Sequence, residues 1–338
     1  MEKIKRFIVG IPKKVYMIGF FLFLLIDAIG FKFDQMLKSV EVFSIADAYN
    51  SLIAVFPSIQ QVAQQYKYIF LVLTVVLFVL WIYRPKLILV KHVSFSKDIA
   101  AVQPSILRKY FVKEIEINQC DEMKKNDTIV NAITIQDKVA EDIQNKRKTS
   151  SLCYYGIAHT PLIFRLGFKM GDQNNIMLLH KIRTNDSLFE EWTHESGYSS
   201  IQPNERNIST KSNELLVSIS TSLPISANDL QSLRPENKHI LSFVCNNISF
   251  DSITSYKLAE NFRNTVMITI RDCIKKYGIR KIHLVISSSV AFTFFLGQAF
   301  SAQHEPITVV YHFQNGIYPW GIYINEPANN ALVINNEI

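Results

Sequence analysis

The sequence lacks the motifs on which most enzyme classes depend. It has no G-x-x-x-x-G-K-S/T phosphate loop, no H-E-x-x-H zinc helix and no G-x-S-x-G nucleophile turn. Its histidines are dispersed along the chain and show no metal-ligand spacing. We therefore expect neither a catalytic site nor a metal centre.

Cysteine is scarce, and its spacing argues against two further kinds of site. No two of the four cysteines form a C-x-x-C pair, so neither a zinc knuckle nor a redox pair is expected. Isolated cysteines in apolar stretches are typical of buried thiols in a reducing compartment. The four are Cys120, Cys153, Cys245 and Cys273.

Two long apolar runs, 15–31 and 68–83, stand near the N-terminus. Each is a little shorter than the roughly 20 residues that cross a hydrocarbon core, and the first extends back to Ile8. Residues 1–90 are therefore predicted to form a two-span transmembrane module. The alternatives are a cleavable signal peptide for the first run and a buried helix of a soluble protein for the second.

Basic residues flank this pair of runs. Five precede the first run and three follow the second closely, whereas the segment between the runs is balanced in charge. This asymmetry predicts that both termini are cytoplasmic. Asp27, near the end of the first run, either lines a pore or contacts another helix, or it lies hydrated at the membrane interface. The net charge of +7 fits the cytoplasmic flanks, and it also fits an anionic ligand.

The rest of the chain contains an internal repeat. IAHTPLIFRLGFKM, beginning at Ile157, is matched about 130 residues later by ISSSVAFTFFLGQAF. Each copy reads as an apolar strand, a small polar turn, a helix with a Leu-Gly step, a polar gap, a second apolar strand and a Trp (Trp192, Trp320). Two such α/β units facing each other predict a pseudo-two-fold cleft.

The pattern around the repeat predicts further elements. Its apolar strands do not alternate with polar residues, which favours a mostly parallel sheet covered on both faces. A polar loop is expected over 197–213, and an added strand follows it at 215–223. The other predicted strands are 87–95, 106–118, 151–158, 176–182, 239–246, 281–288 and 307–313, and the predicted helices are 128–148, 161–170, 255–277 and 290–300.

Ligands of open α/β sheets bind at the carboxyl ends of the strands, which here are the two polar turns. In the first turn, Thr160 is predicted to cap a helix that begins at Pro161, and in the second Ser287–Ser289 open the next helix. Exposed N–H groups and the helix dipole favour anions at such turns. The alternative is that both turns are ordinary helix caps without a ligand.

Two strand ends and several aromatic residues complete the candidate site. Lys181 and Arg183 alternate onto one face and are expected to neutralise phosphates, unless they form an exposed strand end. Trp192, Tyr318 and Trp320 are candidates for stacking on bases, with a core position as the alternative. The ligand-binding set comprises His159, Thr160, Arg165, Lys181, Arg183, Ser287, Ser288, Ser289, His312, Gln314, Tyr318 and Trp320.

The segments 156–192 and 283–325 resemble the SAVED domain family, and a looser resemblance extends over 110–338. In that family two halves similar to the CARF fold form one pocket for a cyclic oligonucleotide. The resemblance implies an α/β fold in which two N-terminal transmembrane helices precede a SAVED domain of two CARF-like, Rossmann-type halves. The expected divisions are a transmembrane module 1–90, a connector with first strands 91–127 and a sensor 128–338, whose halves cover about 110–200 and 214–338.

The resemblance also implies a function. Such sensors occur in effectors of cyclic-oligonucleotide-based anti-phage signalling (CBASS), and the two runs resemble the membrane segments of transmembrane members. We expect a non-enzymatic bacterial inner-membrane effector that binds a cyclic tri- or tetranucleotide made by a CD-NTase-type cyclase. It would form homo-oligomers, act on membrane lipids and need no cofactor, metal, DNA or RNA target. The alternatives are a membrane-anchored cyclic-nucleotide hydrolase (ring nuclease) with His159 as its base, and a structural anchor without a ligand.

Overall fold

The computed structural model describes residues 85–125, 128–146, 150–171, 176–181, 188–193, 199–206 and 212–334. Both predicted spans, Asp27 and Arg183 lie outside the described residues. Within the described ranges, no helix combines the length and the apolar character that a membrane span requires. The chain divides into two compact units, Met1–Pro85 with Leu107–Phe111, and Lys86–Ile106 with Val112–Ile338. The second unit contains both sheets.

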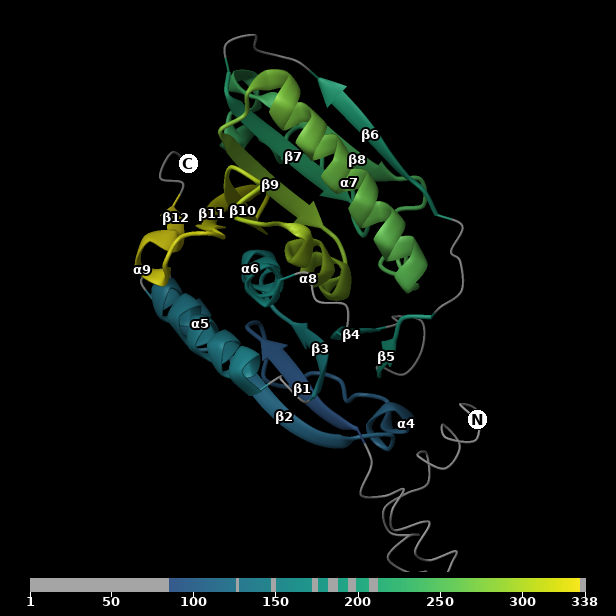
Figure 1. Cartoon of the computed structure of the whole chain (residues 1–338). Coiled ribbons are helices and arrows are strands. Elements are labelled where there is room, and N and C mark those ends of the chain that lie inside the picture. Colours follow the sequence, from purple (N-terminus) through teal and green to yellow (C-terminus); the bar gives the residue numbers. More distant parts are fainter. Residues whose placement is uncertain are drawn as a thin grey trace, which may run out of the picture. The chain divides into compact units, whose positions relative to one another are not determined.

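The first sheet has five strands in the order β2-β1-β3-β4-β5 (Figure 1). Strand β3 pairs in parallel with both β1 and β4, whereas β5 runs antiparallel to β4. The middle of β3 is buried at every position, as the strand sequence without alternation predicts. The strands are β1 Lys86–Val93, β2 Phe111–Asn118, β3 Ser151–Ile157, β4 Ile176–Lys181 and β5 Phe189–Glu191.

The second sheet has seven strands in the order β12-β11-β10-β9-β7-β8-β6. The four strands β10, β9, β7 and β8 are parallel, and antiparallel strands extend the sheet at both edges. The strands are β6 Ile201–Arg206, β7 Glu214–Ser220, β8 His239–Cys245, β9 Lys281–Ser287, β10 Ile307–Gln314, β11 Ile317–Tyr323 and β12 Leu332–Ile334.

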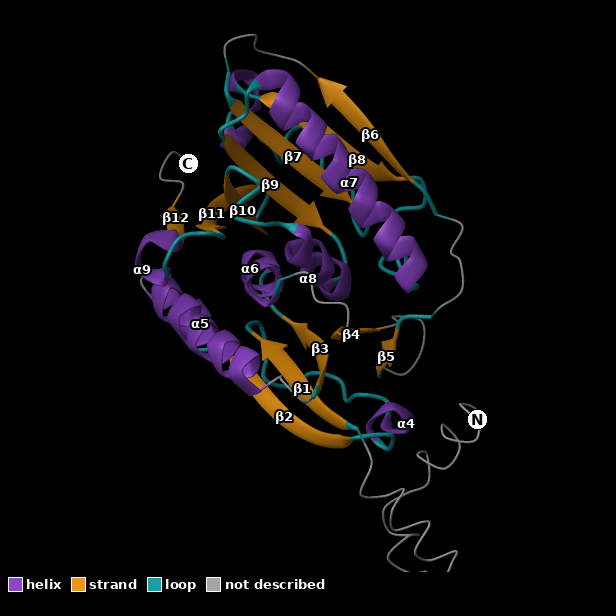
Figure 2. Ribbon diagram, viewed as in Figure 1, coloured by secondary structure: helices purple, strands orange, loops and turns teal. Residues whose placement is uncertain are grey.

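Helices α6 and α8 lie between the two sheets (Figures 1 and 2). Helix α6, from the first copy of the repeat, contacts β10 and β11 of the second sheet, and α8 contacts β3 and β4 of the first. The four longer helices are α5 Ile129–Lys146, α6 Thr160–Met170, α7 Tyr256–Tyr277 and α8 Val290–Ala299. The short ones are α4 Pro104–Leu107, α9 Ala328–Ala331 and the 3-10 turns η1 Glu122–Lys124, η4 Gln231–Leu233 and η5 Pro235–Asn237.

Most expected elements are found, three differ from the expectation, and β5, β11, β12 and α9 were not predicted. The expected added strand at 215–223 is β7, which lies between β9 and β8 inside the parallel part of the sheet. The expected loop over 197–213 contains β6, an edge strand whose residues after Ile201 are exposed and therefore carry no apolar pattern. The expected strand 106–118 is the end of α4 followed by β2. Since β1 and β2 belong to the first sheet, that half begins at Lys86.

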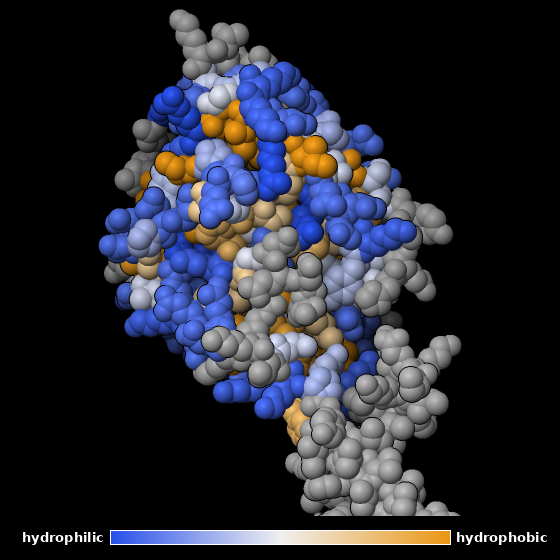
Figure 3. Space-filling view, in the orientation of Figure 1, coloured by the Kyte–Doolittle hydropathy of each residue, from blue (hydrophilic) through white to orange (hydrophobic). Residues whose placement is uncertain are grey.

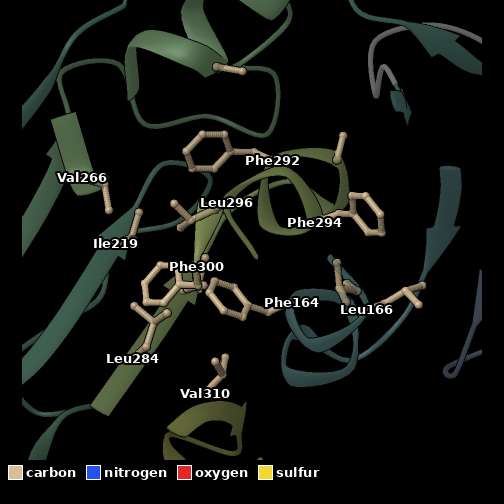
Figure 4. Packing of buried hydrophobic residues seen from close by; sticks show 14 of the residues in the cluster. Phe164, Leu166, Ile219, Val266, Leu284, Phe292, Phe294, Leu296, Phe300 and Val310 are labelled. Atoms are coloured by element: carbon tan, nitrogen blue, oxygen red, sulfur yellow. The ribbon is translucent and has the colours of Figure 1, made fainter. Parts of the chain in front are cut away.

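The Leu-Gly step of each repeat copy lies where α6 and α8 touch. A Cβ atom on Gly167 would stand 2.1 Å from the carbonyl oxygen of Phe294, and one on Gly297 would stand 2.3 Å from that of Phe164. Backbone therefore packs on backbone at both points, which only glycine permits. The two phenylalanines reach into opposite halves: Phe294 stacks on Tyr154 with ring centroids 4.1 Å apart, and Phe164 lies beside Phe300 and Leu284 (Figure 4).

We expect Gly167→Ala and Gly297→Ala each to lower the free energy of unfolding by about 1–3 kcal/mol, because the added methyl group overpacks the α6–α8 contact. In an ordinary helix interior, Gly→Ala raises the free energy of unfolding by up to about 1 kcal/mol. A decrease would therefore show that the glycine lies in the close α6–α8 contact. Urea denaturation measures it. Asn264→Ala, at an exposed position on α7, is the matched control and should have little effect. A stabilised Gly167→Ala protein would contradict the packing.

Candidate ligand site between the two halves

A cavity of about 490 Å³ opens between the two halves, at the carboxyl ends of their parallel strands. The volume falls within the roughly 300–1,000 Å³ of small-molecule sites. The first half contributes the ends of β3 and β4, and the second half the ends of β7 and β9. The described lining residues are Phe95, Gly156, Ile157, Thr160, His180, Lys181, Phe189, Ser222–Ile225, Asp229, Phe250, Ile286–Ala291, Phe313 and Tyr318.

Hydroxyl groups tie together the ends of β7 and β9 on the second half's side of the cavity. Thr221 Oγ1 donates to Ser288 Oγ at 2.7 Å, and Ser287 Oγ accepts the backbone N–H of Leu223 at 3.0 Å. The backbone N–H groups of Thr221 and Ser222 both donate to the carbonyl of Ser287. All three predicted turn serines, Ser287 to Ser289, therefore line the cavity from a braced loop.

Both middle-layer helices begin at this cavity. Ser289 caps α8 and accepts the N–H of Phe292 at 3.3 Å. The first helix differs from the prediction, because its N-cap is His159 and Thr160 is already its first residue. No side chain caps α6, so polar N–H groups of its first turn have no side-chain acceptor there. Two helix N-termini give the cavity a positive potential that favours anions.

The polar turn of the first copy is closed by its own neighbours. Ser94 Oγ lies 2.6 Å from His159 Nδ1 and accepts the backbone N–H of His159 at 2.8 Å. Phe95 stacks on the His159 ring at 3.9 Å, and His312 packs edge-on at 4.6 Å. His159 is 8% exposed and does not line the cavity. The two copies of the repeat are thus not equivalent: all three serines of the second turn line the cavity, whereas in the first turn Thr160 lines it and the His159 ring is covered.

Arg165, predicted to bind the ligand, instead holds the C-terminal segment in place. Its side chain is fully buried, and its Nη2 atom pairs with Asp137 at 2.8 Å. Its guanidinium also donates to the carbonyls of Tyr323, Ile324 and Glu326, at 2.8, 3.1 and 2.9 Å. These contacts give the N–H donors of the guanidinium group hydrogen-bond acceptors, and Asp137 balances its charge. This explains why a cation is tolerated inside the protein.

The other predicted residues divide between the cavity and the core. Lys181 and Tyr318 line the cavity, whereas Gln314 is exposed outside it and His312 is half-buried beside His159. Trp320 is 4% exposed and belongs to a buried apolar cluster with Ile129, Ile133 and Leu162. The core position that was the alternative for the tryptophans therefore holds for Trp320 and for the buried Trp192.

The cavity walls are largely apolar. Phe95, Leu223, Phe250 and Phe313 are between 40% and 57% exposed, and all four line the cavity. Exposed aromatic faces are suited to stacking on bases. Elsewhere in the view of Figure 3 the surface is mostly hydrophilic, with apolar residues showing in limited patches.

Sequence reasoning missed several lining residues for an identifiable reason. Ser222 to Ile225 follow β7, and the carboxyl-end rule would have selected them had β7 been recognised as a central strand. Phe95 and Asp229 lie in loops whose sequence carries no periodic signal. Within the described ranges, no group of three or more potential ligands is placed to hold a metal ion. All four cysteines are buried thiols, as expected.

Residues 135–324 match the sequence model of SAVED, described as the "SMODS-associated and fused to various effectors sensor domain". The match spans more than half of the chain. The chain belongs to the SAVED family. The match begins inside α5 and ends just after β11, so this SAVED domain includes both copies of the repeat and most of the cavity lining. No curated protein matches the sequence.

The SAVED domain is also similar to solved structures of Cap4 SAVED/CARF-domain containing receptors. The Acinetobacter baumannii receptor with the cyclic trinucleotide 2'3'3'-cAAA is 14% identical, with a TM-score of 0.48, over 76% of this chain and 52% of that chain. The same receptor with 3'3'3'-cAAA is 17% identical, with a TM-score of 0.49, over 70% and 51%. The Moraxella osloensis receptor is 16% identical, with a TM-score of 0.44, over 71% and 49%. This chain spans about half the length of those structures.

Stability should fall in mild acid because of the histidines behind the cavity. Burial lowers the pKa of His312 to about 4, and burial, with His312 and His92 nearby, lowers that of His159 to about 3. The unfolded chain takes up these protons near pH 6.5 and the folded chain does not, so stability is complete above pH 6.5 and is lost toward pH 4. Between pH 6.5 and 5, the free energy of unfolding should fall by on the order of 1 kcal/mol less in His312→Phe than in wild type. Urea denaturation at each pH measures it.

The same substitution at exposed His304 is the control and should leave the pH profile of the wild type in place. Parallel profiles for wild type and His312→Phe would show that the folded protein does not keep this imidazole neutral.

Proposed function

We propose that this chain is a sensor that binds a cyclic oligonucleotide, a cyclic tri- or tetranucleotide, in the cytoplasm. The observation that carries the proposal is the cavity at the carboxyl ends of strands from both halves, where helices α6 and α8 begin. A sensor domain is what the SAVED family description names. The described cavity supplies binding groups and no arrangement of nucleophile and base.

The cavity chemistry suits a ring of nucleotides. Lys181, the serine hydroxyls and the helix N-termini provide charge and hydrogen bonds for phosphates. Phe95, Phe250 and Phe313 provide exposed rings for bases. Both sets face one space because it lies between two halves, so a cyclic ligand would contact both halves at once.

We further propose that the sensor is part of a CBASS effector of the bacterial inner membrane, with both termini in the cytoplasm. Its ligand would come from a CD-NTase-type cyclase. Ligand contacts made only in an assembling conformation would shift the population toward homo-oligomers. Two spans per chain cannot enclose an aqueous path, so disruption of membrane lipids would require that assembly. The support is the pair of apolar runs and the charges around them.

The hydrolase alternative named His159 as its general base. That residue is sealed behind Phe95 and bonded to Ser94, and it does not line the cavity. The arrangement therefore supports binding better than turnover. Incubating the protein with cyclic oligonucleotides separates the two functions, since a sensor returns its ligand intact.

We expect Ser288→Trp to abolish ligand binding, because the indole would fill the cavity at the braced serine turn. Calorimetric titration with cyclic tri- and tetranucleotides measures the affinity. The thermal midpoint of the ligand-free protein should change little. Asn264→Trp, on the exposed face of α7, is the control and should bind like wild type. Full affinity in Ser288→Trp would place the ligand elsewhere.

Membrane disruption should require both the ligand and the N-terminal runs. Ligand is expected to convert the detergent-solubilised protein from small to large species and to release dye from liposomes. Removal of residues 1–84, which leaves β1 intact, should preserve binding and abolish dye release. Asp27→Leu should reduce release with little effect on affinity, because an intramembrane carboxylate favours polar helix contacts. Dye release by ligand-free monomers would contradict the coupling.

A further inference from the structure

Three buried polar groups beside the cavity have no hydrogen-bond partner among the described residues. They are the two ring nitrogens of His180, the hydroxyl of Ser222 and the Oδ1 atom of Asp251. His180 is 5% exposed and Ser222 is 7% exposed, and both line the cavity. More than about 90% of buried polar groups in proteins are paired, so three unpaired ones in one place require an explanation.

The groups come from both halves: His180 and Ser222 line the cavity, and Asp251 follows the lining residue Phe250 in the chain. Ser222 and Asp251 lie on neighbouring loops of the second half, which are joined by a hydrogen bond from the N–H of Ser249 to the carbonyl of Thr221 at 3.0 Å. His180 ends β4 of the first half and feels the charge of Asp251. Phe250, next to Asp251 in the chain, also lines the cavity.

Two other buried histidines of this protein are paired at both ring nitrogens. His92 bonds to Tyr154 and Gln119 at 2.9 and 2.8 Å, and His283 bonds to Tyr311 and Glu214 at 2.9 and 3.0 Å. His239 keeps a partner on one ring nitrogen, the carbonyl of Ser212 at 3.1 Å, and leaves the other unpaired. His180 differs in that both of its nitrogens are unpaired and the residue lines the cavity, although leaving such a group unpaired costs about 1–3 kcal/mol. An unpaired buried group destabilises the ligand-free protein. Its presence beside a cavity is explained if a bound ligand supplies the missing hydrogen bond.

We propose that His180 reads the bound nucleotide by accepting a hydrogen bond from one of its N–H or O–H groups. A neutral imidazole carries its proton on one ring nitrogen and leaves the other nitrogen as the acceptor. The donors that a nucleotide offers are a base amino or imino group and the ribose 2′-hydroxyl. This inference rests on the proposed function and assigns His180 a part in it.

The protonation state of His180 separates its role from that of Lys181. Burial lowers the pKa of His180. The charges of Asp251 and Glu190, and a hydrogen-bonding contact with the Glu190 backbone that falls short of ordinary hydrogen-bond geometry, oppose the shift without reversing it. A neutral imidazole accepts hydrogen bonds, and phosphate diesters have no proton to donate at neutral pH. The neighbouring Lys181 is the cation for the phosphates. The end of β4 thus provides one group for base or sugar and one for phosphate.

The test compares variants of the full-length protein in ligand titrations. The probes are 3′3′3′-linked cyclic trinucleotides of adenosine, guanosine, cytidine and uridine, and their tetranucleotide counterparts. For the probe that wild type binds best, His180→Leu should weaken binding about tenfold, since a hydrogen bond at a buried group is lost. His180→Gln, which keeps an acceptor, should recover part of the affinity. The salt dependence should be unchanged in both, whereas Lys181→Met should flatten it.

The ligand-free protein provides a second readout. Replacing an unpaired buried polar group by an apolar one of similar size is neutral or stabilising, so His180→Leu should leave the thermal midpoint equal or higher. A residue with a purely structural role would lower it. His239→Leu is the matched control, since His239 is also a buried strand histidine but lies at the amino end of β8. It should bind the probe like wild type.

Analogues of the probe identify the donor. If a 2′-deoxy probe loses affinity for wild type but not further for His180→Leu, the ribose hydroxyl is the donor. If only a probe without the base amino group behaves this way, the base is the donor. Wild-type affinity in His180→Leu, or full additivity with both analogues, would overturn the inference. Absence of binding by wild type to every probe would instead contradict the proposed function.

Discussion

The backbone contact between α6 and α8 is the constraint on which the rest of this structure depends. Gly167 and Gly297 occupy matching positions of the repeat, and each lies against a carbonyl of the other helix. Their lack of side chains lets the helices form one shared layer, with Phe164 and Phe294 reaching into opposite halves. Because both helices start at the carboxyl ends of their sheets, joining them also brings those ends together around one cavity. The candidate ligand site is thus a consequence of how the halves pack.

The same pseudo-symmetry makes the differences between the copies informative. Where the second copy has Ser289 as the N-cap of α8, the first has His159 as the N-cap of α6, with a ring large enough to reach Ser94 and stack on Phe95. One turn therefore presents hydroxyls to the cavity, and the other supports its wall. An asymmetric cavity reads different parts of a ligand on its two sides, even for a ligand with internal symmetry. Under the proposed function, this asymmetry would provide the physical basis for selectivity among cyclic oligonucleotides.

Several buried polar groups of this protein are held by complete hydrogen-bond networks. Arg165 donates to Asp137 and three carbonyls, and His92 has a partner on each nitrogen. These networks hold the C-terminal segment and the first sheet in place. At the junction of the halves, His180 and Ser222 have no such partners within the described ranges. The position of these two residues in the cavity lining, together with their lack of partners, is what sets them apart.

The sequence by itself determined the parallel α/β units, the repeat and the helix-opening serines, since apolar runs and Leu-Gly steps are local signals. It also placed Ser287–Ser289 and Lys181 at strand ends, where the structure finds the cavity. It did not determine that β7 is a central strand or that β6 pairs at an edge, because pairing depends on partners far along the chain. Only the tertiary structure decided that Arg165, His159 and Trp320 are internal and that His180 is unpaired. A polar side chain binds a ligand or a neighbour according to what packing places beside it, and no local pattern records that.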